Sequence, residues 1–174
     1  MSIQQRPAVE RVQPPKTPYR LVNRVMRGLL SSPRRARGVG RHLMLLHVTG
    51  RKTGRSLVFP VAYRTLEDGR LLVLTNSGWR VNLRGRSDVA VTLLGERRKA
   101  GAELIEDPQT VAQLYRDLIE AVGHEKAGRR MGIRINVPRT PTLDELATAA
   151  TRDGLSVLYL DLDSRSPGAQ PPIR

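Results

Sequence analysis

Cysteine is absent from this chain of 174 residues, and its absence excludes two classes of site. Without cysteine there is neither a disulfide framework nor a thiolate ligand for a metal ion. Histidine is scarce as well, because only His42, His47 and His124 occur, and they lack the spaced His/Glu pairing of a zinc site. We therefore expect no metal cofactor, so the chemistry of the protein has to come from another group.

Long apolar runs are missing too. A helix that crosses a bilayer needs about 20 apolar residues, whereas the densest stretch, Leu43 to Val48, contains a histidine and ends at Thr49-Gly50. The N-terminus also lacks the basic head, apolar middle and small-residue cleavage site of a secretory signal. We expect a soluble, cytoplasmic protein, and 174 residues with 39% apolar side chains suffice for one domain with one core.

Aromatic residues make up only 3% of the chain, with one tryptophan and one phenylalanine. Proteins that bind single-stranded nucleic acid stack the bases on aromatic rings set among basic side chains. In this chain the aromatic residues do not interleave with the basic runs, which argues against a nucleic-acid partner.

Acidic residues are outnumbered by basic ones, 16 to 30, so the formal net charge is +14. Residues 1–56 contain thirteen basic residues and a single acidic residue, Glu10, whereas residues 57–174 contain seventeen basic and fifteen acidic residues. This asymmetry predicts an anionic partner for the N-terminal third, namely a nucleic acid, a lipid surface or a phosphorylated cofactor.

The hydrophobic pattern predicts two tails and an N-terminal helix. Residues 1–17 and 163–174 are polar and rich in proline, so we expect both to be disordered. Within 18–30, apolar residues recur at helical spacing while Arg20, Arg24 and Arg27 fall on the other side, which predicts a basic amphipathic helix. Such a helix can dock over the rest of the fold or make weak, reversible contact with an anionic membrane surface.

The rest of the chain predicts a mostly β fold. Short apolar segments between turn signals predict six strands, at 42–48, 57–63, 71–74, 88–93, 99–105 and 155–162. One helical turn is expected at 79–84, and Asp107-Pro108 and the capping box Thr142-x-x-Glu145 begin two helices within 109–152. We find no assignable pattern over 124–139. The succession predicts one α+β domain over 18–162, built on an antiparallel barrel that hides its edges.

The segment Thr49 to Arg55 combines two glycines, two hydroxyls and three cations between two apolar strands. Glycines allow backbone amides to converge on an anion, and cationic side chains add charge-assisted hydrogen bonds. The segment is therefore a candidate phosphate-binding loop, with an ordinary arginine-rich hairpin as the alternative. It is not a nucleotide P-loop, because the required glycine-lysine spacing is absent.

A second candidate segment runs from Thr75 to Leu83 and contains the single tryptophan. Trp79 precedes Asn82 by three residues, so one helical turn brings both to the same face. An aromatic plane with amide and hydroxyl groups nearby suits a flat heteroaromatic ligand, although a lone tryptophan can equally close the end of a barrel.

Together these segments resemble the deazaflavin-dependent nitroreductase family of actinobacteria. The resemblance rests on Leu45 to Arg55, Phe59-Pro60-Val61, Asp68 to Val73 and Trp79 to Arg84, and it covers about residues 20–106. It implies a split β-barrel like that of FMN-binding proteins. It also implies binding of coenzyme F-420, a deazaflavin with a phosphorylated, polyglutamylated tail, with FMN as the alternative cofactor.

The resemblance also assigns cofactor-binding residues by position. The loop that holds the phosphate tail is matched by Arg51, Lys52, Thr53, Gly54 and Arg55. The stretch along the ring system is matched by Thr75, Asn76, Ser77, Trp79 and Asn82, and the segment Phe59-Pro60-Val61 contributes Pro60. The chain departs from many relatives where Ser77-Gly78 runs directly into Trp79, and where Leu57 and Phe59 replace an arginine and an asparagine. No catalytic residue is assigned.

By the same resemblance, we expect an oxidoreductase that transfers a hydride from reduced coenzyme F-420 to an electrophilic nitro, enone or quinone substrate. Because the cofactor carries such chemistry, the protein needs no catalytic triad or metal centre. A barrel that binds a cofactor or an apolar ligand without turnover is the alternative. A homodimer is also implied, since split barrels commonly dimerise.

Overall fold

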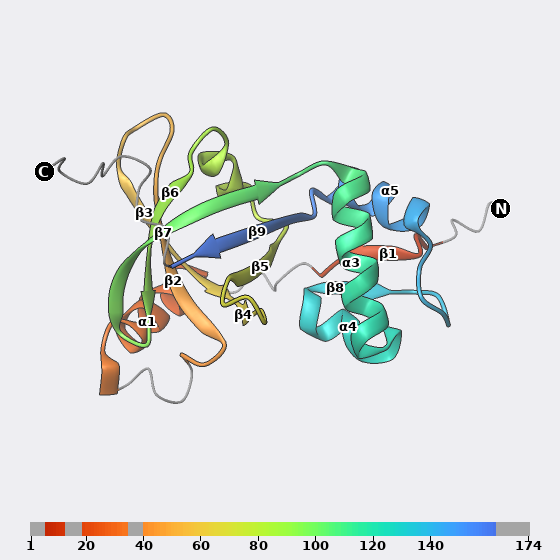
Figure 1. The fold of residues 1–174 in the computed structure, drawn as a ribbon, viewed down its shortest axis with the longest axis horizontal. Coiled ribbons are helices and arrows are strands. Elements are labelled where there is room, and N and C mark those ends of the chain that lie inside the picture. The colour runs from red at the N-terminus through yellow and green to blue at the C-terminus, as the bar shows by residue number, and fades with distance from the viewer. Residues whose placement is uncertain (1–5, 13–18, 35–39, 163–174) are drawn as a thin grey trace, which may run out of the picture. The chain divides into compact units, whose positions relative to one another are not determined.

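The computed structural model describes residues 6–12, 19–34 and 40–162. The chain divides into two compact units, each assembled from separate segments. We call Lys16–Val73, Trp79–Glu103 and Leu158–Arg174 the barrel unit, and Met1–Pro15, Leu74–Gly78 and Leu104–Val157 the helical unit. Each unit is described by itself below, with the elements labelled in Figure 1.

The main sheet has seven strands in the spatial order β3-β2-β6-β7-β9-β5-β4. Their bounds are β2 Leu43–Thr49, β3 Ser56–Ala62, β4 Arg64–Thr65, β5 Leu71–Thr75, β6 Asp88–Leu93, β7 Glu96–Ile105 and β9 Ser156–Asp161. The strand pairs β2·β3, β2·β6, β4·β5 and β6·β7 are antiparallel. Strands β5, β7 and β9 each begin in one unit and end in the other.

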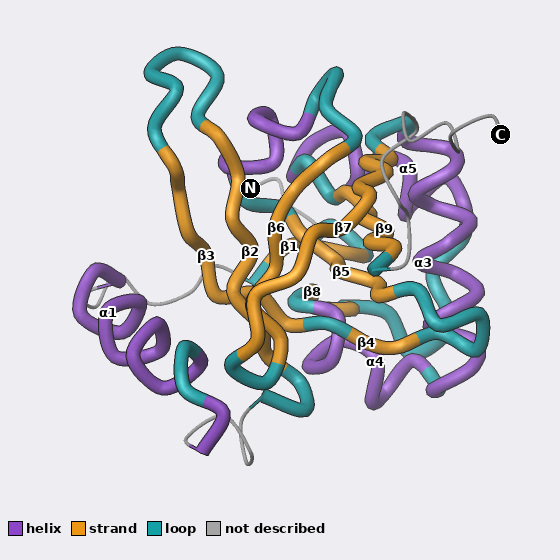
Figure 2. The backbone as a smooth tube through the Cα atoms, turned by 60° about the vertical axis from the view of Figure 1, so that its left-hand side comes forward, coloured by secondary structure: helices purple, strands orange, loops and turns teal. Residues whose placement is uncertain are grey.

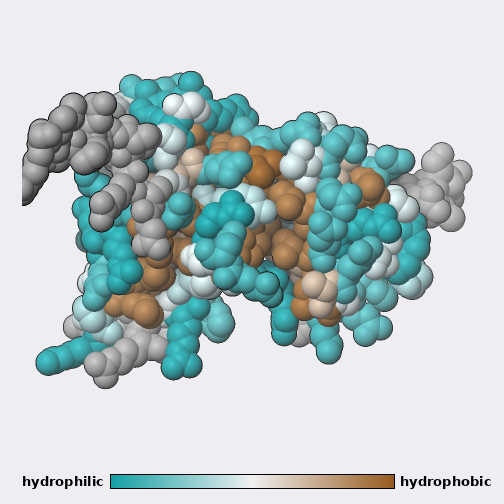
Figure 3. Space-filling model, viewed as in Figure 1, coloured by the Kyte–Doolittle hydropathy of each residue, from teal (hydrophilic) through white to brown (hydrophobic). Residues whose placement is uncertain are grey.

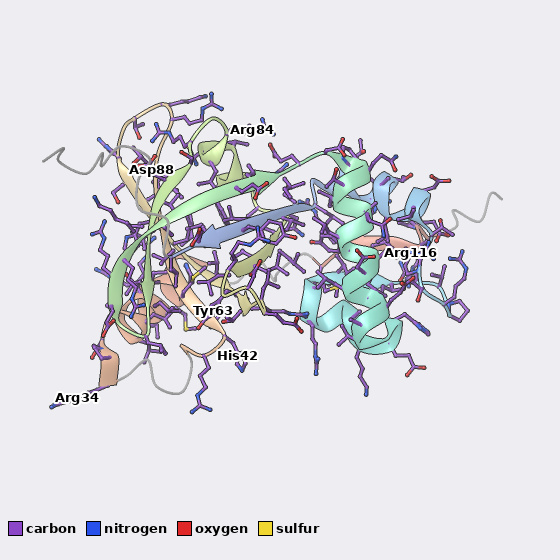
Figure 4. All side chains as sticks on the ribbon, viewed as in Figure 1. Arg34, His42, Tyr63, Arg84, Asp88 and Arg116 are labelled. Atoms are coloured by element: carbon purple, nitrogen blue, oxygen red, sulfur yellow. The ribbon has the colours of Figure 1, made fainter. Side chains whose placement is uncertain are left out.

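A single residue, Tyr63, explains why this sheet curls. The two strands at opposite ends of the sheet order, β3 and β4, are separated in the chain only by Tyr63, so the edges of the sheet must meet there. The Tyr63 amide donates to the His42 carbonyl at 3.0 Å, and its hydroxyl donates to the Gly40 carbonyl at 2.8 Å. Figure 2 shows the curled sheet, and Figure 4 labels Tyr63 and His42.

The predicted fold class, a mostly antiparallel split barrel with helices, is confirmed, but the number of strands is corrected. Six strands were expected, and the main sheet has seven. The additional strand is β4, whose two residues, Arg64 and Thr65, carry no apolar alternation that a sequence pattern could detect.

The alternation of side chains along β2 separates the two faces of the sheet. Met44, Leu46 and Val48 are buried, and Leu46 lies opposite Val91 of β6 in the antiparallel register. His47 occupies the alternate position and therefore lies on the other face. The first face forms the core of the barrel unit, and we call the face that carries His47 the outer face.

Helix α1 (Tyr19–Leu30) contacts β2 and β3, beside which it lies in Figure 2. Leu30 is buried, as its place in the apolar stripe predicts. One prediction for this helix was wrong: Val25, one of the apolar residues at helical spacing, is 54% exposed. Arg27 is exposed as predicted, and it donates to the Val58 carbonyl of β3 at 2.5 Å. Arg27 reaches the strand because its long side chain can extend past the helix edge. The side chains of residues 19–23 lie outside the described part.

The helical unit contains β1 (Val9–Arg11), β8 (Ile133–Ile135), α3 (Pro108–Val122), α4 (His124–Met131) and α5 (Leu143–Asp153). Strands β1 and β8 pair antiparallel, with Val9 opposite Ile135. A strand in the first 17 residues was not expected, because three residues are too few to show a period. Helix α4 and β8 occupy 124–139, which carried no assignable pattern. The other expected tail, 163–174, lies outside the described residues.

Both predicted helix starts are confirmed. The Asp107 carboxylate accepts from the Thr110 amide at 2.8 Å, and the Thr142 hydroxyl accepts from the Glu145 amide at 3.2 Å. Glu145 completes the capping box by accepting from the Thr142 amide at 2.8 Å. Its carboxylate also binds both terminal nitrogens of Arg139 at 2.8 Å, and these contacts lower its pKa to about 2.

Across the ranges 6–12, 19–34 and 40–162, no helix is long and apolar enough to span a membrane.

Candidate functional site

The first candidate segment is the turn between β2 and β3. The Gly50 amide donates to the Arg55 carbonyl at 2.8 Å, and the Gly54 amide donates to the Gly50 carbonyl at 2.9 Å. Gly54 has φ of +65°, a conformation that glycine adopts without strain. The five residues from Arg51 to Arg55 are all exposed, so the turn is a compact hairpin that presents its cations to solvent.

The second candidate segment forms the 3-10 helix η1 (Gly78–Leu83), and it is bonded to the first. The Arg51 amide donates to Asn82 Oδ1 at 3.0 Å, and Arg51 Nη1 lies 3.4 Å from the Val81 carbonyl oxygen. Asn82 in turn donates from Nδ2 to the Trp79 carbonyl at 2.9 Å. Two segments 31 residues apart in the chain are thus brought together by Asn82.

These bonds change how the turn can hold an anion. The sequence predicted that backbone amides converge on a phosphate, but the amides of Gly50, Arg51 and Gly54 all donate within the protein. The Arg55 amide likewise lies 3.4 Å from the Thr53 hydroxyl. The guanidinium and ammonium groups of the loop are then its main candidates for contacts to an anion.

Trp79 packs against Phe59 of β3. The ring centroids are 5.6 Å apart and the planes are inclined by 18°, which is a stacked arrangement. Sequence reasoning noted Phe59 within the Phe59-Pro60-Val61 motif and as a departure from relatives, but it missed the contact with Trp79. One face of the indole is therefore covered by a protein ring, so a flat ligand has to use the other face or the ring edge.

The remaining predicted ring-side residues are Pro60, Thr75, Asn76 and Ser77. Pro60 follows Phe59 on β3, so its side chain is on the opposite face of the strand from the ring stack. Thr75, Asn76 and Ser77 belong to the helical unit, where the Ser77 amide donates to the Thr75 hydroxyl at 3.1 Å. Hydrogen bonds thus join Arg51, Asn82 and Trp79, while the positions of Pro60, Thr75, Asn76 and Ser77 beside the ring system stay predictions.

The charges of the two units differ sharply. The barrel unit has 21 basic and seven acidic residues, whereas the helical unit has nine of each. The entire formal excess of +14 thus belongs to the unit that carries the cationic loop. Figure 3 shows hydrophilic residues at the end of this unit where Figure 1 places the β2–β3 turn. Such a field favours the approach of anions to the loop.

The described ranges contain no group of three or more His, Asp or Glu residues that could hold a metal ion.

Comparisons with known proteins agree with this chemistry. Residues 20–138 match the model of a family described as F420H(2)-dependent quinone reductase. No curated protein matches the chain.

Among solved structures, the chain is similar to an F420-H2 dependent reductase, with 15% identity over 70% of this chain and 95% of the other and a TM-score of 0.40. It is similar to a pyridoxamine 5'-phosphate oxidase-related FMN binding protein from Nostoc punctiforme, with 18% identity over 79% of each chain and a TM-score of 0.42. A structure described as a domain-swapped dimer has 14% identity over 79% of this chain and 92% of its own, with a TM-score of 0.42.

Proposed function

The chain belongs to the F420H(2)-dependent quinone reductase family and is an oxidoreductase that uses this deazaflavin, and from that membership we propose that its electrophilic substrate is a quinone. When bound, the reduced cofactor supplies the hydride. The protein supplies binding, orientation and charge.

The observation that supports a cofactor site here is the bond between the Arg51 amide and Asn82 Oδ1. It holds a loop with three exposed cations next to the helix that carries Trp79. A ligand with a flat ring at one end and an anionic tail at the other needs these two kinds of group side by side. The donor set therefore fits a phosphorylated deazaflavin, and the same chemistry fits FMN less fully because its tail has a single phosphate.

We assign separate roles to the residues of this site. Arg51, Lys52 and Arg55 would hold the anionic tail through charge-assisted hydrogen bonds. Trp79, fixed by its stack on Phe59, would bound one side of the ring system, and Asn82 would position both the loop and the helix. Thr53 and Gly54 shape the turn, while Pro60, Thr75, Asn76 and Ser77 remain proposed contacts on the strength of the family alone.

Oxidation of reduced coenzyme F-420, followed by its absorbance, tests the proposal in two arms, one with menadione and one with a nitroimidazole. We expect turnover with the quinone. Binding of the cofactor without oxidation in either arm would favour the non-enzymatic alternative, and turnover of the nitroimidazole alone would contradict the substrate class.

A double variant separates the loop from general charge effects. Arg51→Ala with Lys52→Ala should raise KM for the cofactor at least about tenfold, because each charge-assisted contact contributes roughly 1.5–3 kcal/mol. The matched control, Arg98→Ala with Lys126→Ala, removes the same charge from exposed positions elsewhere. If both double variants change KM for the cofactor equally, the loop is an ordinary hairpin that does not bind the cofactor.

We also propose that α1 makes weak contact with anionic lipid, because Val25 and Arg24 are both exposed on it. The fraction of protein that co-sediments with anionic vesicles should fall for Arg24→Ser with Val25→Ser and stay unchanged for Arg64→Ser.

The homodimer remains a proposal, which light scattering of the purified chain tests.

A further inference from the structure

A polar cavity of about 290 Å³ opens on the outer face of β2, β6 and β7, entirely within the barrel unit. Its charged and polar lining includes His47, Thr49, Ser56, Asp88, Arg97 and Lys99. Binding sites for small molecules range upward from about 300 Å³. The volume therefore suits a ligand at the small end of that range.

The strand register explains the hollow. Ala90 lies opposite His47 on one side and opposite Lys99 on the other, and Gly101 lies opposite Asp88. Two small residues in the middle of a row of longer side chains leave the space between them unfilled. Figure 4 labels Asp88 at the beginning of β6, which marks one end of the cavity.

Cations outnumber acids around this space. Arg97 and Lys99 line it from β7, and Asp88 is the single acid among the residues that line it. Arg27 of α1 is close enough to act on His47, and burial, Arg97 and Arg27, in that order, lower the pKa of His47. The hydroxyls of Thr49, Ser56 and Ser87 add neutral donors.

The cavity is distinct from the site proposed for the cofactor. None of the residues from Arg51 to Arg55 lines it, and neither Trp79 nor Asn82 does. Phe59, the partner of Trp79, lies opposite Leu46 in the register and therefore on the core side of the sheet. The lining residues Thr49 and Ser56 belong to the strands on either side of the turn, not to its tip.

We infer that this cavity binds a small oxyanion, the phosphate or carboxylate group of a small molecule, between Lys99 and Arg97 on one side and His47 on the other. The hydroxyls would satisfy the remaining oxygens of the ligand. Asp88 also lines the cavity and would repel a second anionic group. It therefore favours a ligand whose negative charge is confined to the end that contacts Arg97 and Lys99.

Anion binding here is coupled to protons. His47 Nε2 lies 2.8 Å from the Thr92 hydroxyl, and the charged groups that act on His47 are Arg97 from β7 and Arg27 from α1. Lys99 on β7 and Asp88 on β6 line the same cavity. A bound anion offsets the repulsion from the cations and makes protonation of His47 easier. Affinity for acetate, which keeps its single charge over this range, should therefore increase as the pH falls from about 8 to about 6.

The test is calorimetric titration of the full chain, without cofactor, with inorganic phosphate in one arm and acetate in the other, at constant ionic strength. Histidine side-chain NMR signals report which site is occupied. We expect saturable binding with a perturbed His47 signal and, in the acetate arm, tighter binding at the lower pH. The arm that binds more tightly identifies the phosphate or the carboxylate as the ligand group.

Two variants make the assignment specific. Arg97→Ala should weaken binding about tenfold or more, whereas Arg98→Ala, on the opposite face of the same strand, should change it less than about twofold. Ala90→Leu fills the space and should abolish binding, with circular dichroism confirming the fold. Unchanged affinity in Arg97→Ala and in folded Ala90→Leu would overturn the inference, and so would displacement of phosphate by coenzyme F-420.

Discussion

The backbone amide of Arg51 donates a hydrogen bond to Oδ1 of Asn82 at 3.0 Å, and this contact joins the cationic loop to the helix that contains the tryptophan. A side-chain oxygen thus fixes the start of the loop, while the cationic side chains stay available to a ligand. Asn82 also donates to the Trp79 carbonyl, so one amide group organises both halves of the site.

Replacing Asn82 should impair cofactor binding more than folding. Asn82→Ala removes both hydrogen bonds, and we expect the free energy of unfolding to fall by about 1–2 kcal/mol in urea denaturation. Asn82→Asp keeps the acceptor for the Arg51 amide and should recover part of that loss. Asn136→Ala is the control, because Asn136 donates to the Pro7 carbonyl in the helical unit. A cofactor affinity that falls equally in Asn136→Ala would contradict the role of Asn82.

Trp79 should report directly on ligand binding, because it is the only tryptophan of the chain. We expect coenzyme F-420 to quench its emission on binding. Phe59→Ala removes the stacked partner, which should shift the emission to longer wavelength and lower stability by about 1–2 kcal/mol. Cofactor binding that leaves Trp79 emission unchanged would count against its place beside the ring system.

The turn between β6 and β7 contains a strained residue. Leu94 has φ of +50° and is 45% exposed, so the left-handed conformation costs strain for which little burial compensates. Asparagine tolerates this conformation, and Asn-Gly is favoured in two-residue hairpins. Leu94→Asn should raise the free energy of unfolding by about 1 kcal/mol, measured by chemical denaturation. A loss of stability would instead show that Leu94 packs against a neighbour.

The next residue tests close packing. A Cβ at Gly95 would overlap the Pro33 nitrogen and lie 2.6 Å from the Ser32 carbonyl carbon, and φ is +86°. Gly85 also has positive φ, +72°, but nothing lies within 4 Å of its Cβ position. Gly85→Ala should cost about 1–2 kcal/mol from strain alone. Gly95→Ala should cost clearly more, and equal melting temperatures of the two variants would refute the contact.

Acid stability should depend on Glu145. Its pKa is lowered from 4.5 to about 2, first by the hydrogen bonds from Arg139 and then by the Thr142 amide. Since the folded value lies below the unfolded one, the stabilisation is complete above about pH 4.5 and is lost as the pH falls through about 2. Glu145→Gln should therefore narrow the difference in melting temperature between pH 5 and pH 2. An unchanged difference would mean that the solvent-exposed pair contributes little.

Much of both units could be predicted from local pattern. Short apolar segments between turn signals predicted the strands from Leu43 to Thr49 and from Asp88 to Leu93, and the capping residues Asp107 and Thr142 begin their helices as expected. These features depend only on residues that are neighbours in the chain, so the local sequence is sufficient to predict them.

Other features depend on partners far away in the chain. Strands β1, β4 and β8 have two or three residues each, too few to show a period, and they exist because another segment supplies hydrogen bonds. The candidate site shows the same limit. The residue types near Trp79 indicated a ring-binding surface, but the stack on Phe59 and the bond from Arg51 to Asn82 required the fold.

The confinement of all net charge to the barrel unit also has a kinetic consequence. Ionic strength screens the encounter with a multiply charged cofactor but has little influence on the encounter with an uncharged quinone. Raising the salt concentration therefore slows loading of the reductant and leaves capture of the oxidant almost unchanged. The reaction cycle alternates between binding of the reduced cofactor and binding of the quinone. The salt concentration therefore determines which of these two steps limits the rate.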